Sequence, residues 1–279
     1  MSDSKPENTS VAFIGGGQMA ACLISGLLES GFPAAQVHVA EIDAERRQWL
    51  QDNYAVQTHA DGNQACAQAG TVVLAVKPQI MAQVLRSLRM PQGCVAISIA
   101  AAINLPTLQR WGNDGVHWIR VMPNTPSLLR KGISGICAPA GTPQAAREQA
   151  ETLMRSAGAV VWVDSETQLD ALTGVSGSGP AYFFYFVEVL RDAGVAQGLS
   201  PEMADELARG TLIGAAAMLE QPQADAAQLR RNVTSPGGTT AAAISSMQEQ
   251  DLAALIARAV QAARERSAAL GQQLDREHP

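Results

Sequence analysis

Residues 11–20 read VAFIGGGQMA, and this stretch decides which fold the chain is expected to adopt. Four apolar residues, typical of a buried strand, run directly into a GxGxxA pattern formed by Gly15, Gly17 and Ala20. Gly15 permits a tight turn, Gly17 lets a pyrophosphate approach the backbone, and Ala20 allows the following helix to pack closely. The first turn of that helix offers free N–H groups and the positive end of its dipole. The stretch predicts a dinucleotide-binding turn; the alternative is a glycine-rich turn without a ligand.

The rest of the first half extends this pattern into a sheet. Short β-branched runs alternate with helix-length segments, which is typical of parallel strands joined by crossover helices. Strands are expected at 11–14, 37–41, 71–76, 94–99, 116–122, 134–138 and 159–163. Beyond residue 165 the strand pattern stops, and helices are expected at 181–194, 201–220, 224–231, 238–249 and 250–274. The sequence predicts an α/β chain with a Rossmann-type dinucleotide-binding domain over residues 1–165 and an all-helical domain over residues 166–279.

The composition excludes several classes of function. Only 16% of residues are charged and 47% are apolar, which argues against intrinsic disorder. The 20 Lys and Arg against 26 Asp and Glu leave no basic surplus for phosphates, so no nucleic-acid partner is expected. The four cysteines lie too far apart for a metal knuckle or a compact disulfide framework, and no metal is expected. The residues 1–10, MSDSKPENTS, are polar and lack the apolar core of a secretion signal, so we expect a cytoplasmic protein.

The shortage of charge needs an explanation of its own. A soluble domain ordinarily carries about a quarter charged residues. Residues 182–187, YFFYFV, are apolar on every face of the expected helix, so that helix must be buried all round, in its own domain or against a partner. No segment reads as a membrane span, because the longest uncharged run, residues 8–28, reaches spanning length only by including polar residues and glycines. An obligate oligomer would turn the apolar excess into an interface.

The ends of the expected strands carry candidate binding residues. Glu41 lies 24 positions after Gly17, near the offset at which an acidic residue accepts the ribose 2′-hydroxyl of NAD, which favours NADH. Arg46 and Arg47 are close enough in sequence to reach a 2′-phosphate, so NADPH stays open, as does a solvated strand end without a ligand. Lys77, at another strand end, is placed to line the same crevice, with a plain surface lysine as the alternative.

Three further stretches carry chemistry. Residues 98–101, SIAA, end a strand on the crevice side, and residues 120–126, RVMPNTP, leave the sheet through two prolines as a pocket wall or a rigid turn. Residues 235–240, SPGGTT, precede a helix with two glycines exposing backbone donors. Successive N–H groups and the helix dipole can hold a carboxylate there, although a plain helix cap explains the spacing equally well.

Taken together, six motifs resemble those of delta-1-pyrroline-5-carboxylate reductases. In chain order they are FIGGGQMA from Phe13, AVKPQ from Ala75, SIAA from Ser98, VMPNTP from Val121, GVSGSGPAY from Gly174 and NVTSPGGTT from Asn232. The resemblance covers nearly the whole chain. It implies reduction of 1-pyrroline-5-carboxylate, a cyclic imine, to L-proline with NADPH or NADH, the last step of proline biosynthesis. It also implies a Rossmann domain and a helical dimerisation domain that interlocks with a second subunit, with rings of dimers common in the family.

The resemblance, together with the spacing of Glu41 and the donors of the turn at residues 237–240, implies roles for individual residues. Cofactor contacts are expected at Gly15, Gly16, Gly17, Gln18, Met19, Ala20, Glu41, Asn63, Ala75, Val76, Lys77, Pro78, Ala100, Ala101 and Asn232. Substrate contacts are expected at Glu166, Gly237, Gly238, Thr239 and Thr240. Two positions depart from the family pattern: Ala102 stands where glycine is usual after SIAA, and Glu41 stands where NADPH-preferring members often carry a neutral residue.

The implied mechanism needs little from side chains. The cofactor supplies the hydride, and the protein supplies orientation. We expect the substrate carboxylate in the turn at residues 237–240, with the Thr240 hydroxyl as the catalytic group that binds or helps protonate the ring nitrogen. His38, His59, His117 and His278 lie outside the motifs, so no Ser-His-Asp arrangement is expected.

Two rival interpretations remain open from the sequence. A β-hydroxyacid dehydrogenase shares the glycine-rich start and a helical second domain, but it needs a catalytic lysine on the first helix of that domain. Residues 181–192 contain none. A non-enzymatic nucleotide-sensing regulator would need a partner surface and no carboxylate-binding turn.

Overall fold

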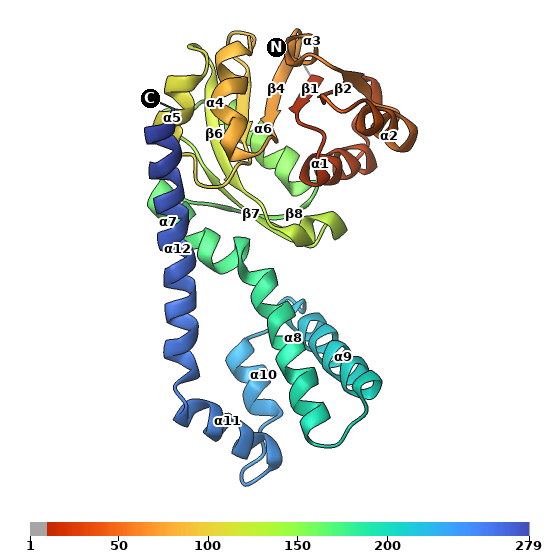
Figure 1. Cartoon of the computed structure of the whole chain (residues 1–279), viewed down its shortest axis with the longest axis vertical. Helices are drawn as coiled ribbons and strands as arrows, with labels where there is room; N and C mark the ends of the chain where they lie inside the picture. Colours follow the sequence, from red (N-terminus) through yellow and green to blue (C-terminus); the bar gives the residue numbers. More distant parts are fainter. Residues whose placement is uncertain (1–9, 279) are drawn as a thin grey trace. The chain divides into compact units, whose positions relative to one another are not determined.

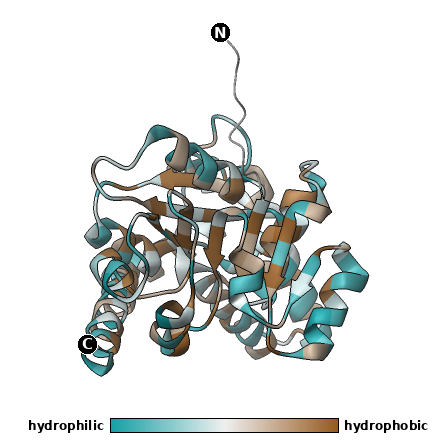
Figure 2. Ribbon diagram, turned by 90° about the horizontal axis from the view of Figure 1, so that it is seen from above, coloured by the Kyte–Doolittle hydropathy of each residue, from teal (hydrophilic) through white to brown (hydrophobic). Residues whose placement is uncertain are grey.

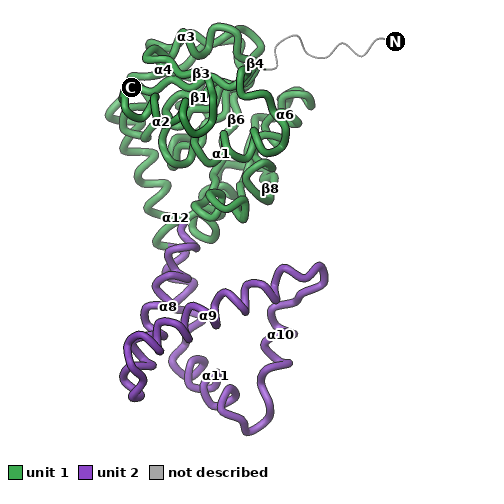
Figure 3. Tube along the Cα trace, turned by 90° about the vertical axis from the view of Figure 1, so that its right-hand side faces the viewer, with its two compact units in different colours: residues 1–177, 262–279 green, residues 178–261 purple. Residues whose placement is uncertain are grey.

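A computed structural model describes residues 10–278 and divides them into two compact units (Figure 3). Unit 1 takes in the described residues up to 177 together with those from 262 onward, and unit 2 is residues 178–261. The stretch 1–9, part of the segment expected to carry no secretion signal, lies outside the described residues. The domain boundary expected after residue 165 stays a prediction. The division into compact units is a separate description, in which unit 1 ends at residue 177 and resumes at residue 262.

Unit 1 is built on an eight-stranded sheet, which confirms the expected α/β architecture (Figure 1). The strand order is β3-β2-β1-β4-β5-β6-β7-β8, and the pairing of β6 with β7 is antiparallel while all the others are parallel. The strands are β1 (Ser10–Ile14), β2 (Val37–Ala40), β3 (Gln57–His59), β4 (Ala69–Leu74), β5 (Val95–Ser98), β6 (His117–Met122), β7 (Gly132–Cys137) and β8 (Gly158–Trp162). Seven were expected within one or two residues of these bounds, and β3 was missed.

Helices pack on both faces of this sheet, so the apolar residues of each strand alternate between two cores. In β1, Ala12 and Ile14 belong to one core, whereas Val11 and Phe13 belong to the other. The helices are α1 (Gln18–Glu29), α2 (Ala44–Tyr54), α3 (Gly62–Cys66), α4 (Pro78–Ser87), α5 (Leu105–Trp111), α6 (Gln144–Arg155) and α7 (Glu166–Leu172), with 3₁₀ turns at Ala34–Gln36 and Thr125–Leu129 and a π-helical turn at Thr173–Gly177. Seen from above, the apolar colour concentrates in the strands and the polar colour in the surrounding helices (Figure 2).

Unit 2 is all-helical, as the sequence indicated. It consists of α8 (Gly179–Ala196), α9 (Pro201–Leu219), α10 (Ala226–Asn232), α11 (Thr239–Glu249) and the beginning of α12 (Leu252–Glu277), whose later turns belong to unit 1. Helices α8 and α9 pack against each other. Even so, Phe183, Phe184 and Tyr185 are 59%, 62% and 65% exposed in the single chain, so these side chains are not buried within the unit. Among the described residues, no helix has the length and apolar character that crossing a membrane requires.

Candidate functional site

A crevice of about 720 Å³ opens in unit 1 beside the carboxyl ends of β1, β2 and β4. Strand β1 lies between β2 and β4, so the chain order along the sheet reverses here. In open α/β sheets this switch point is where ligands bind. The expected cofactor residues that line the crevice are Gly15, Gly17, Glu41, Asn63, Ala75, Val76 and Lys77. The other expected residues of unit 1, Gly16, Gln18, Met19, Ala20, Pro78, Ala100 and Ala101, do not line it.

The turn formed by residues 15–17, called the glycine turn below, has the backbone shape that dinucleotide binding requires. Gly15 adopts φ +98°, and a Cβ there would meet the Ala75 carbonyl oxygen at 2.9 Å, so only glycine fits. Gly17 caps α1 through its backbone alone, because no side chain bonds to the first N–H groups of the helix. Close backbone approach and free helix N–H groups are what a pyrophosphate requires. Ala20 is buried in the core, which fits its expected role in close helix packing.

Glu41 follows β2 and is held over the glycine turn. Its Oε2 accepts a hydrogen bond from the Gly16 N–H at 2.9 Å, and its Oε1 accepts one from the Asp43 N–H at 3.1 Å. The carboxylate is therefore fixed at the rim of the crevice by two backbone donors. This is the position at which a Rossmann fold reads the adenosine ribose.

Both neighbouring arginines bind backbone carbonyls. Arg46 Nε donates to Gly16 O at 2.6 Å, and its guanidinium lies 4.1 Å from the centre of the Trp49 ring. Arg47 Nη1 donates to the carbonyls of Glu41 at 2.7 Å and Ile42 at 3.0 Å. The two cations thus hold together the glycine turn and the segment after β2.

Asn63 and Lys77 lie on the crevice wall in different ways. The Asn63 side chain ties the start of α3 to the end of α4, because its Oδ1 accepts from the Arg89 N–H at 2.7 Å and its Nδ2 donates to Ser87 O at 3.3 Å. Lys77 is exposed at the start of α4. The sequence reasoning missed Asp43 and Asp61, which also line the crevice and cap helices α2 and α3.

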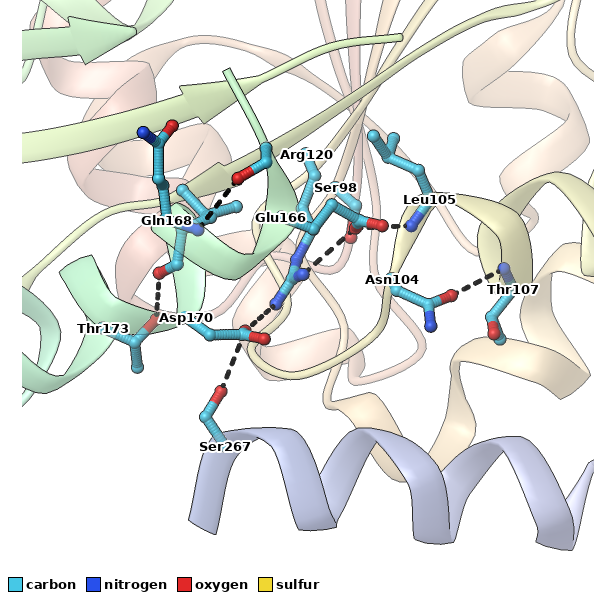
Figure 4. A network of polar contacts seen from close by, with 12 residues as sticks. Ser98, Asn104, Leu105, Thr107, Arg120, Glu166, Gln168, Asp170, Thr173 and Ser267 are labelled. Carbon is cyan, nitrogen blue, oxygen red and sulfur yellow. Dashed lines mark hydrogen bonds and ion pairs between the residues drawn. The ribbon is translucent and has the colours of Figure 1, made fainter. Parts of the chain in front are cut away.

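Glu166, expected to contact substrate, does not line the crevice and belongs to a separate polar network (Figure 4). Arg120 on β6 has a side chain only 3% exposed; its Nη1 donates to Glu166 Oε1 and its Nη2 to Asp170 Oδ1, each at 3.1 Å. Glu166 Oε1 also accepts from the Leu105 N–H at 2.7 Å, at the start of α5. Asp170 Oδ1 accepts from Ser267 Oγ on α12 at 3.4 Å. One buried cation thus links β6, α7 and, through the carboxylates, α5 and α12.

This network was not found from the sequence, although its signals were present. Arg120 stands inside the otherwise largely apolar strand β6. Glu166 and Asp170 are four residues apart and therefore share one face of α7. Arg120 pairs in register with Ser98, the last residue of β5, so the network lies beside the loop that contains Ala100 and Ala101.

That loop also contains a strained residue. Ala102 has φ +72°, in the left-handed region that disfavours residues with a Cβ. A Cβ added at Gly271 on α12 would collide with the Ala102 carbonyl oxygen, so helix and loop are in close contact. Farther along α12, Asp275 accepts hydrogen bonds from Thr107 Oγ1 and Arg110 Nη2 of α5, and these bonds lower the pKa of the Asp275 carboxyl.

The remaining expected residues lie in unit 2, around the turn that precedes α11. Gly237 has φ +68°, and Gly238 caps α11 without a side-chain hydrogen bond. Thr239 and Thr240 are exposed, and the described part of the chain supplies no hydrogen-bond partner to either hydroxyl. The Asn232 amide oxygen accepts from Gln228 Nε2 at 2.7 Å. The Gly238 N–H is not free, because it donates to the Ser235 carbonyl at 3.0 Å. The unused donors of the turn in the described residues are the N–H and hydroxyl groups of Thr239 and Thr240.

The cysteines and histidines offer no competing centre in the described residues. Burial raises the pKa of the Cys66 thiol to about 12 and those of Cys22 and Cys94 to about 11, so none is an activated nucleophile. His38 and His59 stack and share a hydrogen bond, Nδ1 to Nε2, of 3.1 Å. No group of three or more metal-binding side chains occurs in the residues from 10 to 278.

Comparison with known proteins adds sequence relatives and solved structures. A family profile described as "Pyrroline-5-carboxylate reductase dimerisation" matches residues 166–270, and one described as "NADP oxidoreductase coenzyme F420-dependent" matches residues 10–102. The pyrroline-5-carboxylate reductase of Pseudomonas aeruginosa is 45% identical over 95% of this chain and 97% of its own length. The solved structure of such a reductase from Coxiella burnetii is 35% identical, with TM-score 0.89, over 95% of this chain and 99% of that one. A Plasmodium falciparum pyrroline carboxylate reductase, solved with NADP bound, is 28% identical with TM-score 0.80, over 96% and 100%.

Proposed function

This chain belongs to the family of pyrroline-5-carboxylate reductases, and we propose from its geometry how its own residues perform that reaction. It is an NAD(P)H-dependent oxidoreductase that reduces the C=N bond of 1-pyrroline-5-carboxylate to give L-proline, the last step of proline biosynthesis. Membership decides against the two rival interpretations, the β-hydroxyacid dehydrogenase and the non-enzymatic regulator.

The crevice at the β1 switch point would hold the dinucleotide. The observation that carries this assignment is the Gly15 turn, where a Cβ would meet the Ala75 carbonyl and where α1 presents uncapped N–H groups. Gly15, Gly17, Ala75, Val76 and Lys77 surround the expected path of the pyrophosphate. When bound, the cofactor supplies a hydride to the imine carbon.

The turn at residues 237–240 would bind the substrate carboxylate. The free N–H groups of Thr239 and Thr240 at the N-terminus of the eleven-residue helix α11 suit an anion, and the Thr239 hydroxyl adds a donor. We assign to Thr240 a hydrogen bond to the ring nitrogen, which gains a proton as the imine becomes an amine. Glu166 and Asn232 complete the expected set of ligand contacts as proposals resting on the family resemblance.

The function is tested by following oxidation of NADH and of NADPH with 1-pyrroline-5-carboxylate. Thr240→Ala should lower kcat/KM about tenfold to hundredfold, because a substrate group loses its partner in the transition state. Thr240→Ser should restore most of the loss. The matched control is Ser245→Ala on the same helix, where the hydroxyl bonds to Glu249 at 3.1 Å. Wild-type kinetics in Thr240→Ala would remove Thr240 from the mechanism, and no turnover by the wild type would contradict the proposed function.

The protein assembles as an oligomer through its dimerisation domain. We propose that homodimers are the basic unit and that they join into a larger ring, on the strength of the resemblance. We also propose a cytoplasmic location. All four cysteines are free thiols buried in unit 1, as expected in a reducing compartment.

A further inference from the structure

We propose that this chain selects NADH over NADPH and that Glu41 makes the selection. The inference rests on the proposed function of the crevice, and it concerns the one group in which the two cofactors differ, the 2′-phosphate of the adenosine ribose. A carboxylate at the end of the second strand accepts hydrogen bonds from ribose hydroxyls, whereas a phosphate at the same place brings like charges together.

Glu41 cannot readily turn away from a bound nucleotide. Both of its oxygens are held by backbone N–H groups, those of Gly16 and Asp43, at 2.9 and 3.1 Å. To make room for a 2′-phosphate the side chain would have to give up both hydrogen bonds. The negative charge is therefore a fixed feature of the rim, close to the glycine turn.

The two arginines that could neutralise a phosphate have other partners. Arg46 binds Gly16 O at 2.6 Å and Gly17 O at 3.4 Å and stacks on Trp49. Arg47 bridges the carbonyls of Glu41 and Ile42. The hydrogen bonds of the two arginines hold the glycine turn and the segment after β2, which form the ribose side of the crevice. If either arginine turned towards a phosphate, these hydrogen bonds would break and the binding site would loosen.

The charges of the other residues that line the crevice also favour NADH. Among the described residues that line the crevice, Glu41, Asp43 and Asp61 carry carboxylates and Lys77 alone carries an amine. Lys77 follows β4 and Glu41 follows β2, on opposite sides of β1. The side of the crevice next to Glu41 is thus acidic, which suits an uncharged ribose hydroxyl and repels a phosphate dianion.

The test uses the intact chain and two probes that lack the nicotinamide, ADP-ribose and its 2′-phosphate, with dissociation constants from calorimetry. We expect the wild type to bind ADP-ribose at least about tenfold more tightly and kcat/KM to favour NADH by a similar factor. Added salt should narrow the gap, because the repulsion is screened. Glu41→Ser should shift the binding ratio towards the phosphate by about tenfold, and Glu41→Gln, which keeps the shape, should give most of that shift.

Control variants separate the contributing groups. Asp52→Asn removes a carboxylate of α2 that lies outside the crevice, and the ratio should stay as in the wild type. Arg46→Gln and Arg47→Gln should change the dissociation constants of the two probes by the same factor.

Three outcomes would overturn the inference: equal or tighter binding of the 2′-phosphate by the wild type, an unchanged ratio in Glu41→Ser, or a selective loss of phosphate binding in either arginine variant. Failure of both probes to bind would refute the assignment of the crevice itself. Selective binding without turnover would support the selection by Glu41 and contradict only the assigned reaction.

Discussion

At the residue scale, the side chain of Ala102 departs from the pattern expected of the family. Ala102 follows the SIAA stretch, where the resemblance implies glycine, and its φ of +72° explains why glycine suits the position. The carbonyl oxygen of Ala102 is in close contact with Gly271, so this backbone conformation is held from outside by α12. The departure was visible in the sequence, but the strain behind it was not.

We expect Ala102→Gly to raise the free energy of unfolding by about 0.5–1 kcal/mol, since relief of the left-handed strain exceeds the added freedom of the unfolded chain. Urea denaturation at constant protein concentration measures the change. Ala101→Gly is the control, because Ala101 has no positive φ and should only lose stability. Equal effects of the two substitutions would show that Ala102 is not strained.

At the element scale, the sequence was most informative where strands are buried. Runs such as 71–76 and 94–99 are apolar enough to predict strands, and the structure confirms them within two residues. β3 (Gln57–His59) was missed because it is three residues long, polar and at the edge of the sheet. Strand β7 runs antiparallel to β6, and this direction could not be predicted because the periodicity of a short stretch does not indicate which strand it pairs with.

Some residues of the candidate site could likewise be found from the sequence, and others could not. The glycine turn, Glu41 and Lys77 could be found because strand ends and their spacing are local properties of the sequence. The links made by Arg120 span 46 and 50 residues, so no local pattern indicates its partners. The hydrogen bonds of Arg46 to the glycine turn were likewise hidden, and the sequence left open whether that arginine would face a phosphate.

Arg120→Met should destabilise the protein by about 3 kcal/mol, because it leaves the carboxylates of Glu166 and Asp170 without their shared cation in a largely buried place. Adding Glu166→Gln and Asp170→Asn to this variant should recover part of the loss. The control is Arg110→Gln, which breaks an exposed ion pair with Asp275 and should cost less than about 1 kcal/mol. Similar losses in the two single arginine variants, measured by denaturant titration, would show that the network contributes no more than a surface pair.

At the scale of the whole molecule, the structure shows where the apolar residues that accompany the low charge content are exposed. The large exposed apolar side chains are concentrated in unit 2, on α8, α9 and α12, while unit 1 buries its apolar residues in two cores. A unit whose helices expose Phe183, Phe184 and Tyr185 leaves an apolar surface that a subunit interface would bury. Residues 166–270 match a dimerisation family, which supports our proposal that a second copy of the chain covers this surface.

We therefore expect a stable dimer or larger assembly by sedimentation velocity at micromolar concentration. Phe184→Glu together with Tyr185→Glu should shift the protein towards monomers, because two charges would be buried at the interface. Leu129→Glu, which replaces a leucine that is 78% exposed in unit 1, is the matched control and should leave the assembly intact. A monomeric wild type would leave the apolar surface of unit 2 without an explanation.

The return of the chain to unit 1 at residue 262 also sets an order of events during synthesis. Leu274 fills the core on one face of the sheet, and the Trp111 indole N–H donates to the His278 carbonyl at 2.7 Å. These residues leave the ribosome only after all of unit 2 has been made. Unit 1 therefore cannot complete its core until the whole of unit 2, with its exposed apolar helices, has been synthesised.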